Sequence, residues 1–446
     1  MNKKLLEGNI TKTLIAFSLP FLASNLIQSL YNVVDMVVVG QFSGTESSSG
    51  VVIGGQATFI ITFLAIGLCN GAAIMIGQYI GANKMDRVKK VIGTLSITIA
   101  VLAIVITVLL LFFADPFLLL IKTPTESFLE AKAYLSVTSL GIFFIFMYNA
   151  LAAVIRATGD SKTPMNFILI ACIMNIFLDL LFIINFNMGA KGAAIATVIS
   201  QATSAILCVI YMKRSNFIFD FKLSSFRVCK EELSHILRLG LPMSIQNTIT
   251  GLSFVFLTAL VNMTSGVIGS AAQGAISRFN NFGILPAAAI SLALSTIVAQ
   301  NLGANQLDRA KQALRVAFRF AFACGFFVFF VGALFPAQIL GIFTKDPEVV
   351  AMGIDYMRFF VFDFLFVPFS FCFNGFFMGA GATKFSMFNN IFNSVILRVP
   401  IAYFLAITLN MGLVGISFSI PLSSIGAIII STTYYLSKKW LKIKLV

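Results

Sequence analysis

The chain has 446 residues, of which 59% are hydrophobic and only 11% are charged, and its mean hydropathy is +0.96. Soluble domains carry roughly 25% charged residues, so this composition excludes an ordinary soluble globular protein and indicates a bilayer as the solvent. The formal net charge of +14 does not indicate nucleic-acid binding, because the basic residues form short clusters between long apolar stretches and no single basic face.

The first apolar stretch follows a basic N-terminus and runs from about Thr13 to Val39. It is too long for the apolar region of a signal peptide, and no small-residue cleavage site follows it. We therefore expect a first transmembrane helix that is retained.

Eleven further apolar stretches follow along the chain. A spanning helix needs about 20 predominantly apolar residues. By this rule the spans begin near residues 14, 51, 92, 134, 164, 192, 239, 271, 316, 356, 388 and 413. The sequence thus predicts an all-α membrane protein with twelve transmembrane helices.

The basic residues favour one side of the membrane. Of the 31 Lys and Arg residues, 24 lie in the two termini and in the loops on the same side, five lie in the other loops, and Arg278 and Arg398 lie inside spans. Cytoplasmic loops carry the excess of Lys and Arg. We expect both termini in the cytoplasm and a multi-pass protein of the cell inner (cytoplasmic) membrane.

An internal repeat organises these spans. GANKMDRVKK at 81–90 recurs as GANQLDRAKQ at 303–312, an offset of 222 residues, and MGAKG at 188–192 returns as MGLVG at 411–415, an offset of 223. Because six helices is an even number, both halves enter the membrane from the same side, as in transporters with parallel repeats. We predict two pseudo-symmetric six-helix lobes, 1–212 and 239–446, joined by a cytoplasmic linker, 213–238.

Only three acidic residues lie within the predicted spans: Asp35, Asp179 and Asp363. A charge at the bilayer centre costs about 2.5–3.5 kcal/mol on insertion scales, so each acid needs a partner or a function. The repeat offers an internal control, because Asp35 aligns with Leu257, and Asp179 with Ile401 or Ala402. The duplicated fold therefore packs without these two acids.

Polar residues accompany the two N-terminal acids at helical spacing. The first span carries Asn25, Gln28, Asn32 and Asp35, the fifth carries Asn175 and Asp179, the sixth carries Thr197 and Gln201, and Tyr134 begins the fourth. Residues three and four apart share a helix face, and the predicted topology puts Asp35, Asp179, Thr197 and Tyr134 near the outer ends of their spans. These residues predict a site in the N-terminal lobe.

The chemistry of this site admits two ions. Carboxylates in a pocket of low dielectric repel each other, and desolvation favours their neutral forms, so such a pair takes up a proton readily. Carboxylate, amide and hydroxyl oxygens of Asp35, Asn175, Asp179 and Thr197 would equally suit Na⁺. The alternative is that both acids only form hydrogen bonds between helices.

The third acid, Asp363, has two readings. Arg278 and Arg398 are in the same half, so Asp363 could form a buried ion pair or triad with them. Alternatively, Asp363 could belong to a second coupling or substrate site with Asn374 of the same Phe-rich span. The polar residues that we assign to a candidate substrate cavity are Gln28, Asn32, Gln201, Gln246, Arg278, Asp363 and Asn374.

The motifs resemble those of the multidrug and toxic compound extrusion (MATE) transporters, particularly the bacterial DinF-like branch. The resemblance rests on LPFLASNLIQSLYNVVDMVVVGQ (19–41), GQYIGANKMDRVKK (77–90), RATGDSKTPM (156–165) and NIFLDLLFI (175–183). It implies a secondary antiporter that exports organic, often cationic, compounds in exchange for H⁺ or Na⁺ by alternating access.

The resemblance also implies roles for single residues. It places Asp35 at the centre of coupling, adds Asn175, Asp179 and Thr197, and includes Tyr134 and Asn149 of the fourth span. Pro20 matches a proline near which the first helix bends in some members. A glutamate that some members carry in the seventh span is replaced here by Gln246 and Asn247, which puts a cation site in the C-terminal lobe in doubt.

Other functions compete with this one. A flippase for lipid-linked sugars of the same superfamily would need a more basic cavity than Arg278 and Arg398 provide, a membrane-embedded enzyme would need a nucleophile with its base, and a channel would ignore ion gradients. We expect no enzyme activity, no cofactor beyond the coupling ion, and no nucleic-acid partner. We expect a monomer in the lipid bilayer that carries small organic substrates.

Overall fold

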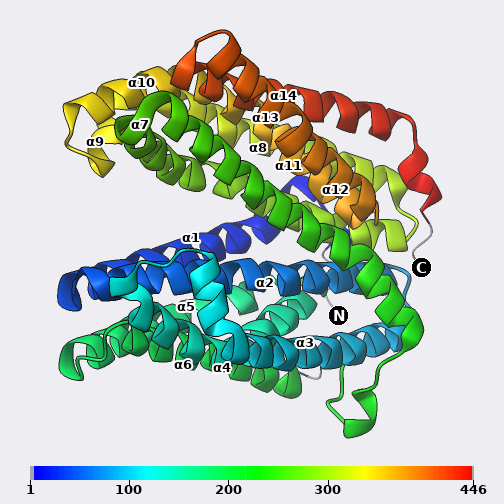
Figure 1. The fold of residues 1–446 in the computed structure, drawn as a ribbon. Coiled ribbons are helices and arrows are strands. Elements are labelled where there is room, and N and C mark those ends of the chain that lie inside the picture. Colours follow the sequence, from blue (N-terminus) through cyan, green and yellow to red (C-terminus); the bar gives the residue numbers. More distant parts are fainter. Residues whose placement is uncertain (1–4, 216, 444–446) are drawn as a thin grey trace. The chain divides into compact units, whose positions relative to one another are not determined.

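The computed structural model describes residues 5–215 and 217–443, and at residue 32 it describes the backbone alone. Helices make up nearly all of this part of the chain, with short turns between them (Figure 1). Backbone hydrogen bonds within each helix satisfy the polar groups that a bilayer cannot solvate. The predicted all-α architecture is therefore confirmed.

The chain divides into two compact units. The N-terminal unit is Ala23–Ser244, and the C-terminal unit joins the segment that ends at Leu22 to the segment that begins at Ile245. Each change of unit falls inside a helix, and the two changes are 222 residues apart (244 − 22), which is the repeat offset. The start of each repeat's first helix thus belongs to the other repeat's unit, an exchange that the predicted lobes did not include.

The N-terminal unit contains the following elements: most of α1 (Ile10–Phe42), then α2 (Gly44–Gly81), α3 (Met85–Leu120), α4 (Thr125–Ala157), α5 (Lys162–Asp179), the π-helix η2 (Leu180–Asn185), α6 (Gly189–Arg214) and the short 3₁₀ helix η3 (Leu223–Ser225). α4 packs against α2, α3 and α6. Glycines permit this packing, because a Cβ at Gly50 would lie 2.7 Å from Glu130 Cβ, and one at Gly141 only 2.2 Å from Val198.

The C-terminal unit contains most of α7 (Lys230–Gly303), then α8 (Leu307–Leu334), α9 (Pro336–Phe343), α10 (Pro347–Phe360), α11 (Asp363–Gly379), α12 (Thr383–Ile391), the π-helix η4 (Phe392–Leu397), α13 (Arg398–Tyr403), the π-helix η5 (Phe404–Thr408), α14 (Gly412–Leu436) and the 3₁₀ helix η6 (Lys439–Lys442). α11 packs against α8 and α14. The buried core there includes aromatic residues, and the ring of Phe376 contacts those of Tyr435 and Trp440.

Within the described residues, ten helices are long and apolar enough to cross a membrane, and the count rises to eleven if α10 and α11, bent by 52°, form one span. α7 is counted once although it has 74 residues, which at about 1.5 Å per residue would extend far beyond a bilayer core of about 30 Å. Its backbone leaves the helical region at Gly266, with φ 57° and ψ −149°. α7 therefore consists of two helices in sequence.

The backbone repeats as the sequence does. Left-handed residues recur in pairs at offset 222, namely Gly44 with Gly266, Asn83 with Asn305, and Gly159 with Gly381, and at offset 223, namely Asn187 with Asn410, and Gly189 with Gly412. The break in α7 is thus the counterpart of the junction between α1 and α2. These positions are Gly or Asn because other side chains rarely adopt positive φ.

The change of offset from 222 to 223 can be located. It falls between Gly381 and Asn410. This interval contains the π-helix η4, whereas the matching segment of the first repeat lies in α5 and is an ordinary α-helix. A π-helix bonds i to i+5 and so holds one more residue per hydrogen-bonded turn than an α-helix. We place the inserted residue in η4, which aligns Arg398 with Asn175 and Ala402 with Asp179.

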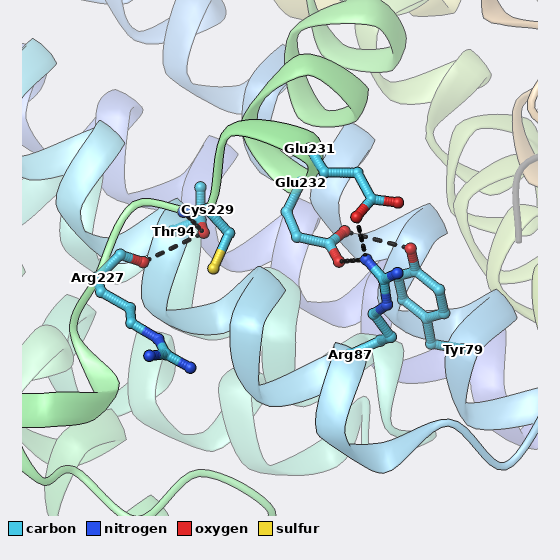
Figure 2. A network of polar contacts seen from close by, with 7 residues as sticks. All are labelled: Tyr79, Arg87, Thr94, Arg227, Cys229, Glu231 and Glu232. Carbon is cyan, nitrogen blue, oxygen red and sulfur yellow. Dashed lines mark hydrogen bonds and ion pairs between the residues drawn. The ribbon is translucent and has the colours of Figure 1, made fainter.

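Figure 2 shows a polar network that fixes the start of α7 to α2 and α3 within the N-terminal unit. Arg87 Nη1 lies 2.6 Å from Glu231 Oε2 and 2.8 Å from Glu232 Oε1, and the Tyr79 hydroxyl donates to Glu232 Oε2 at 3.2 Å. The Glu232 side chain is fully buried, whereas that of Glu231 is 60% exposed. Arg87 therefore neutralises a buried carboxylate at the point where the chain enters α7.

The segment before α7 is held at a second point. The Thr94 hydroxyl of α3 donates to the Arg227 carbonyl and accepts from the Cys229 amide at 3.1 Å (Figure 2). Gly93 lies against η3, where a Cβ would come within 2.1 Å of the Ser225 carbonyl oxygen. The chain between the repeats is thus docked on α3.

Candidate functional site

Three polar side chains meet inside the N-terminal unit and form what we call the carboxylate cluster: Asp35 of α1, and Asn175 and Asp179 of α5. Asn175 and Asp179 are fully buried, and Asp35 is 6% exposed. With its nitrogen turned toward the acids, the Asn175 amide donates to Asp35 Oδ1 at 2.7 Å and to Asp179 Oδ2 at 3.2 Å. One amide therefore bridges two carboxyl groups from different helices.

Because Asp35 Oδ1 and Asp179 Oδ2 both accept from this one amide group, the two carboxyl groups lie close together. Two carboxylates that lie this close repel each other, and a positive charge between them relieves that repulsion. Asp179 Oδ1 is buried without a hydrogen-bond partner. Two buried acids in this arrangement can bind a proton or a small cation between them.

A second layer of hydroxyl groups lies beside the cluster. The Tyr31 hydroxyl of α1 donates to Thr197 Oγ1 of α6 at 2.8 Å. Tyr134 of α4 is 7% exposed and belongs to a buried cluster with Val38 and Val39, which follow Asp35 in α1. Its ring needs the space above Gly54, where a Cβ would lie 2.6 Å from Tyr134 Cδ1.

The structure therefore brings together Asp35, Asn175, Asp179, Thr197 and Tyr134, the residues that the sequence places at one depth. It adds Tyr31, which the sequence reasoning missed. The signal was present, because Tyr31 lies four residues before Asp35 and so shares its helix face.

Other predicted residues lie apart from the cluster. The Asn149 amide of α4 donates to the Ile145 carbonyl of its own helix at 2.8 Å, Gln28 is exposed, and Gln201 is half-buried. The structure therefore does not bury Gln28 with Asp35, although both lie on the same helix. The Asn32 side chain lies outside the described residues.

Pro20 lies inside α1 and is buried. It precedes the change of unit at Leu22 by two residues, and its repeat counterpart Pro242 precedes Ser244 by the same distance. Proline removes a backbone hydrogen bond from a helix interior, so each helix is weakened where it passes from one unit to the other.

In the C-terminal unit, side chains of α7, α10 to α14 and η4 enclose a cavity that we call the C-terminal cavity, with Asp363, Asn374 and Arg398 among its lining residues. Asp363 and Arg398 are buried, but no ion pair within 4.0 Å joins them in the described part of the chain. Arg278 is exposed and does not line the cavity. The predicted ion pair or triad is therefore wrong, because Asp363 and Arg398 form hydrogen bonds with Ser424 and Ser423 and Arg278 lies outside the cavity.

Gln246 is 6% exposed, and its Oε1 is buried without a hydrogen-bond partner. It does not line the C-terminal cavity. The sequence reasoning also missed asparagines that do, namely Asn280, Asn389, Asn390 and Asn393. The spacing of the last three, at i, i+1 and i+4 in an apolar span, was the available signal.

Both halves of the chain match the same protein family. The model of the MatE family matches residues 20–181 and again residues 242–404. The two matches start 222 residues apart and end 223 apart, as the repeat and its single insertion require.

Relatives align along the whole chain. The probable multidrug resistance protein YpnP of Bacillus subtilis is 27% identical over 445 residues and 98% of each chain is covered. The probable multidrug resistance protein NorM of Thermotoga maritima is 27% identical, with 97% of this chain and 94% of that one covered. A solved structure, described as the outward-facing conformation of a multidrug resistance MATE family transporter, superposes with a TM-score of 0.93 at 25% identity over 99% of this chain and 98% of that one.

Proposed function

Because the chain belongs to the MatE family of membrane transporters, we propose that it is a secondary active antiporter that exports small organic compounds, often cationic ones, by alternating access. Relatives named as multidrug resistance proteins support export of drugs and toxic compounds. They favour neither a flippase for lipid-linked sugars nor an enzyme or a channel.

The observation that carries the proposal is the carboxylate cluster. Two buried acids bridged by one amide are costly in a membrane unless they bind a positive charge. We propose that this charge is a proton, because two buried carboxylates that share one amide donor repel each other, and one proton relieves that repulsion. Na⁺, held by oxygens of Asp35, Asn175, Asp179 and Thr197, is the alternative that the experiment below separates.

Coupling follows from the charge of the cluster. A proton that enters from outside removes one negative charge and weakens the attraction of the cluster for a cationic substrate. Release of the proton to the cytoplasm restores that charge. Each proton that moves inward gains about 2.3 kcal/mol per 100 mV of membrane potential, and this free energy drives export.

We further propose twelve spans, with both termini in the cytoplasm of the cell. The two helices of α7 joined at Gly266, and the bent pair α10 and α11, support this count. The excess of Lys and Arg on one side supports the orientation. Green fluorescent protein fused to either end should fluoresce, since it matures in the cytoplasm, and a dark fusion at one end would contradict an even number of spans.

The same architecture supports a multi-pass protein of the inner membrane that works as a monomer. Each unit has its own buried core, as shown by separate clusters around Tyr134 and around Tyr356. Light scattering of the purified protein should give the mass of one 48.4 kDa chain after subtraction of detergent. A mass of two chains would contradict the monomer.

The test of coupling is efflux of a cationic dye from proteoliposomes under an imposed pH gradient or an imposed Na⁺ gradient. We expect the pH gradient alone to drive efflux, and Asp179→Asn to remove that dependence. Asp86→Asn, which changes an exposed acid of α3, is the matched control and should behave as wild type. Efflux driven by the Na⁺ gradient alone would mean that the coupling ion is Na⁺ and not a proton. Efflux that follows neither gradient would contradict antiport.

A further inference from the structure

More than half of the residues that line the C-terminal cavity are polar or charged. It holds about 980 Å³ of empty space, its open mouth included. Five asparagines line it: Asn280, Asn374, Asn389, Asn390 and Asn393. Polar residues within membrane helices are costly and usually mark a functional site. Five asparagines around one cavity therefore indicate a ligand-binding site.

Two opposite charges face this cavity without being paired. Asp363 Oδ1 accepts from the Ser424 hydroxyl at 2.5 Å, and Arg398 Nε donates to Ser423 Oγ at 3.1 Å. Both side chains line the same cavity, yet no salt bridge joins them among the described residues. The structure thus leaves one carboxylate oxygen and the terminal guanidinium nitrogens available to a ligand.

The amide and hydroxyl groups around these charges give an independent indication. Side-chain oxygens of Asn374, Asn389, Asn393, Ser370 and Ser386 are buried with no hydrogen-bond partner, and all five residues line the cavity. An unmade hydrogen bond of a buried group costs about 1–3 kcal/mol, and native proteins hold few such groups. A bound molecule that supplies these hydrogen bonds would remove the cost.

The charges decide the chemical class of that molecule. The planar guanidinium of Arg398 suits a carboxylate, which it can bind through two parallel hydrogen bonds, and Asp363 suits a protonated amine. A simple cation would be repelled by Arg398, and a simple anion by Asp363. Rings of Phe254, Phe360 and Phe371 also line the cavity and suit an apolar or aromatic body.

The repeat argues against a merely structural role for the two charges. The position of Arg398 is occupied by Asn175 in the first repeat, and that of Asp363 by Gly141. The same fold therefore forms in the N-terminal unit without either charge. Arg398 and Asp363 belong to the C-terminal unit alone, as a site specific to that unit would require.

We propose that the C-terminal cavity binds zwitterionic organic compounds that carry a carboxylate and a protonated amine on an apolar or aromatic body. Arg398 binds the carboxylate, Asp363 binds the amine, and the asparagines form hydrogen bonds with the polar groups between them. The claim that such compounds are exported rests on the proposed antiport, whereas their binding does not.

The experiment compares three forms of one probe, an amino acid with a coumarin side chain. The free amino acid is a zwitterion, its methyl ester is a cation, and its N-acetyl derivative is an anion. Binding to the purified full-length protein is measured by fluorescence anisotropy, without an ion gradient. We expect the zwitterion to bind at least about 10-fold more tightly than either derivative, the ratio that one charge-assisted hydrogen bond of about 1.5 kcal/mol provides.

Variants assign each charge to its partner group. Arg398→Gln should weaken binding of the zwitterion about 10-fold and should not weaken binding of the cationic methyl ester, which Arg398 repels. Asp363→Asn should likewise weaken binding of the zwitterion but not of the anionic N-acetyl derivative. Arg398→Lys should restore part of the affinity, because Lys keeps the charge but not the planar fork. Arg278→Gln, an exposed charge of the same unit, should change nothing.

Two outcomes would overturn the proposal: equal affinity for all three probes, or a preference for the zwitterion that survives Arg398→Gln. If Arg398→Gln fails to fold, Asn393→Leu tests the cavity without a change of charge, and unchanged zwitterion affinity in that variant contradicts the proposal. Asp35→Asn should bind the zwitterion as wild type does. This last measurement separates the cavity from antiport, because a failure of coupling leaves the binding result intact.

Discussion

The two repeats share a backbone but hold opposite electrostatic arrangements at equivalent positions. In the N-terminal unit, Asp35 and Asp179 flank the Asn175 amide. In the C-terminal unit, the counterparts are Leu257, Ala402 and Arg398. The first arrangement attracts a positive charge, and the second supplies one. A duplicated fold therefore does not imply a duplicated site, and for this reason we propose coupling in one unit and zwitterion binding in the other.

The largest effect should come from the bridge of the carboxylate cluster. Asn175→Leu removes the one group that donates to both acids, at 2.7 and 3.2 Å, and two lost bonds to charged groups are worth about 1.5–3 kcal/mol each. We expect dye efflux driven by a pH gradient to fall about 100-fold. Asn149→Leu, whose amide bonds within its own helix, should reduce it no more than about twofold by the same reasoning. Equal losses in the two variants would contradict a special role of the carboxylate cluster in coupling.

A second effect concerns stability and compares two arginines of the repeat. Arg87→Ala leaves the buried Glu232 carboxylate without its ion pair, which should cost about 1–3 kcal/mol. Arg309, its counterpart, donates to the backbone carbonyls of Glu7 and Gly8 at exposed sites, where water can replace it. Thermal unfolding in detergent should show a clearly larger drop in melting temperature for Arg87→Ala than for Arg309→Ala. The reverse order would mean that Glu232 is not held by Arg87.

A third effect tests the close packing behind Tyr134. Gly54→Ala would place a Cβ 2.6 Å from Tyr134 Cδ1, whereas at the neighbouring Gly55 the nearest atom, the Tyr134 hydroxyl, is 4.0 Å away. The counterpart of Gly54 in the second repeat is Ile276, so the space is specific to the N-terminal unit. We expect transport to fall about 10-fold in Gly54→Ala, an effect of about 1.4 kcal/mol, with near wild-type rates in Gly55→Ala. Wild-type transport in both would show that the position of Tyr134 does not matter.

The smallest effect should come from the hydroxyl layer. Tyr31→Phe deletes the 2.8 Å hydrogen bond to Thr197 and keeps the ring, a loss of about 0.5–1 kcal/mol. We expect a two- to fivefold lower transport rate, which follows from that free energy, with the preference for a pH gradient retained. Loss of that preference would mean that Tyr31 takes part in coupling itself.

The sequence predicted much of the fold because its signals are local. Apolar runs of about 20 residues identify spans, and the repeated GAN motifs at 81–83 and 303–305 fall on the same left-handed turns, at Asn83 and Asn305. It also predicted that Asp35, Asn175 and Asp179 belong together, because helical spacing and depth place them on facing helices.

What the sequence did not predict depends on how helices rotate and where they change partners. No local pattern indicates that α1 and α7 pass between units at Leu22 and Ser244. Arg278 seemed available to Asp363, but the rotation of α7 leaves it exposed. The pairing of Arg398 with the position of Asn175 depends on one inserted residue, which became visible only as the π-helical turn of η4.

The most direct test of the central claim, that coupling acids lie in the N-terminal unit alone, is dye efflux measured with and without an imposed pH gradient in Asp35→Asn and Asp363→Asn. The ratio of the two rates reports coupling independently of dye affinity. We predict that this ratio falls to one in Asp35→Asn and stays at the wild-type value in Asp363→Asn. A ratio of one in Asp363→Asn, or a wild-type ratio in Asp35→Asn, would contradict the account.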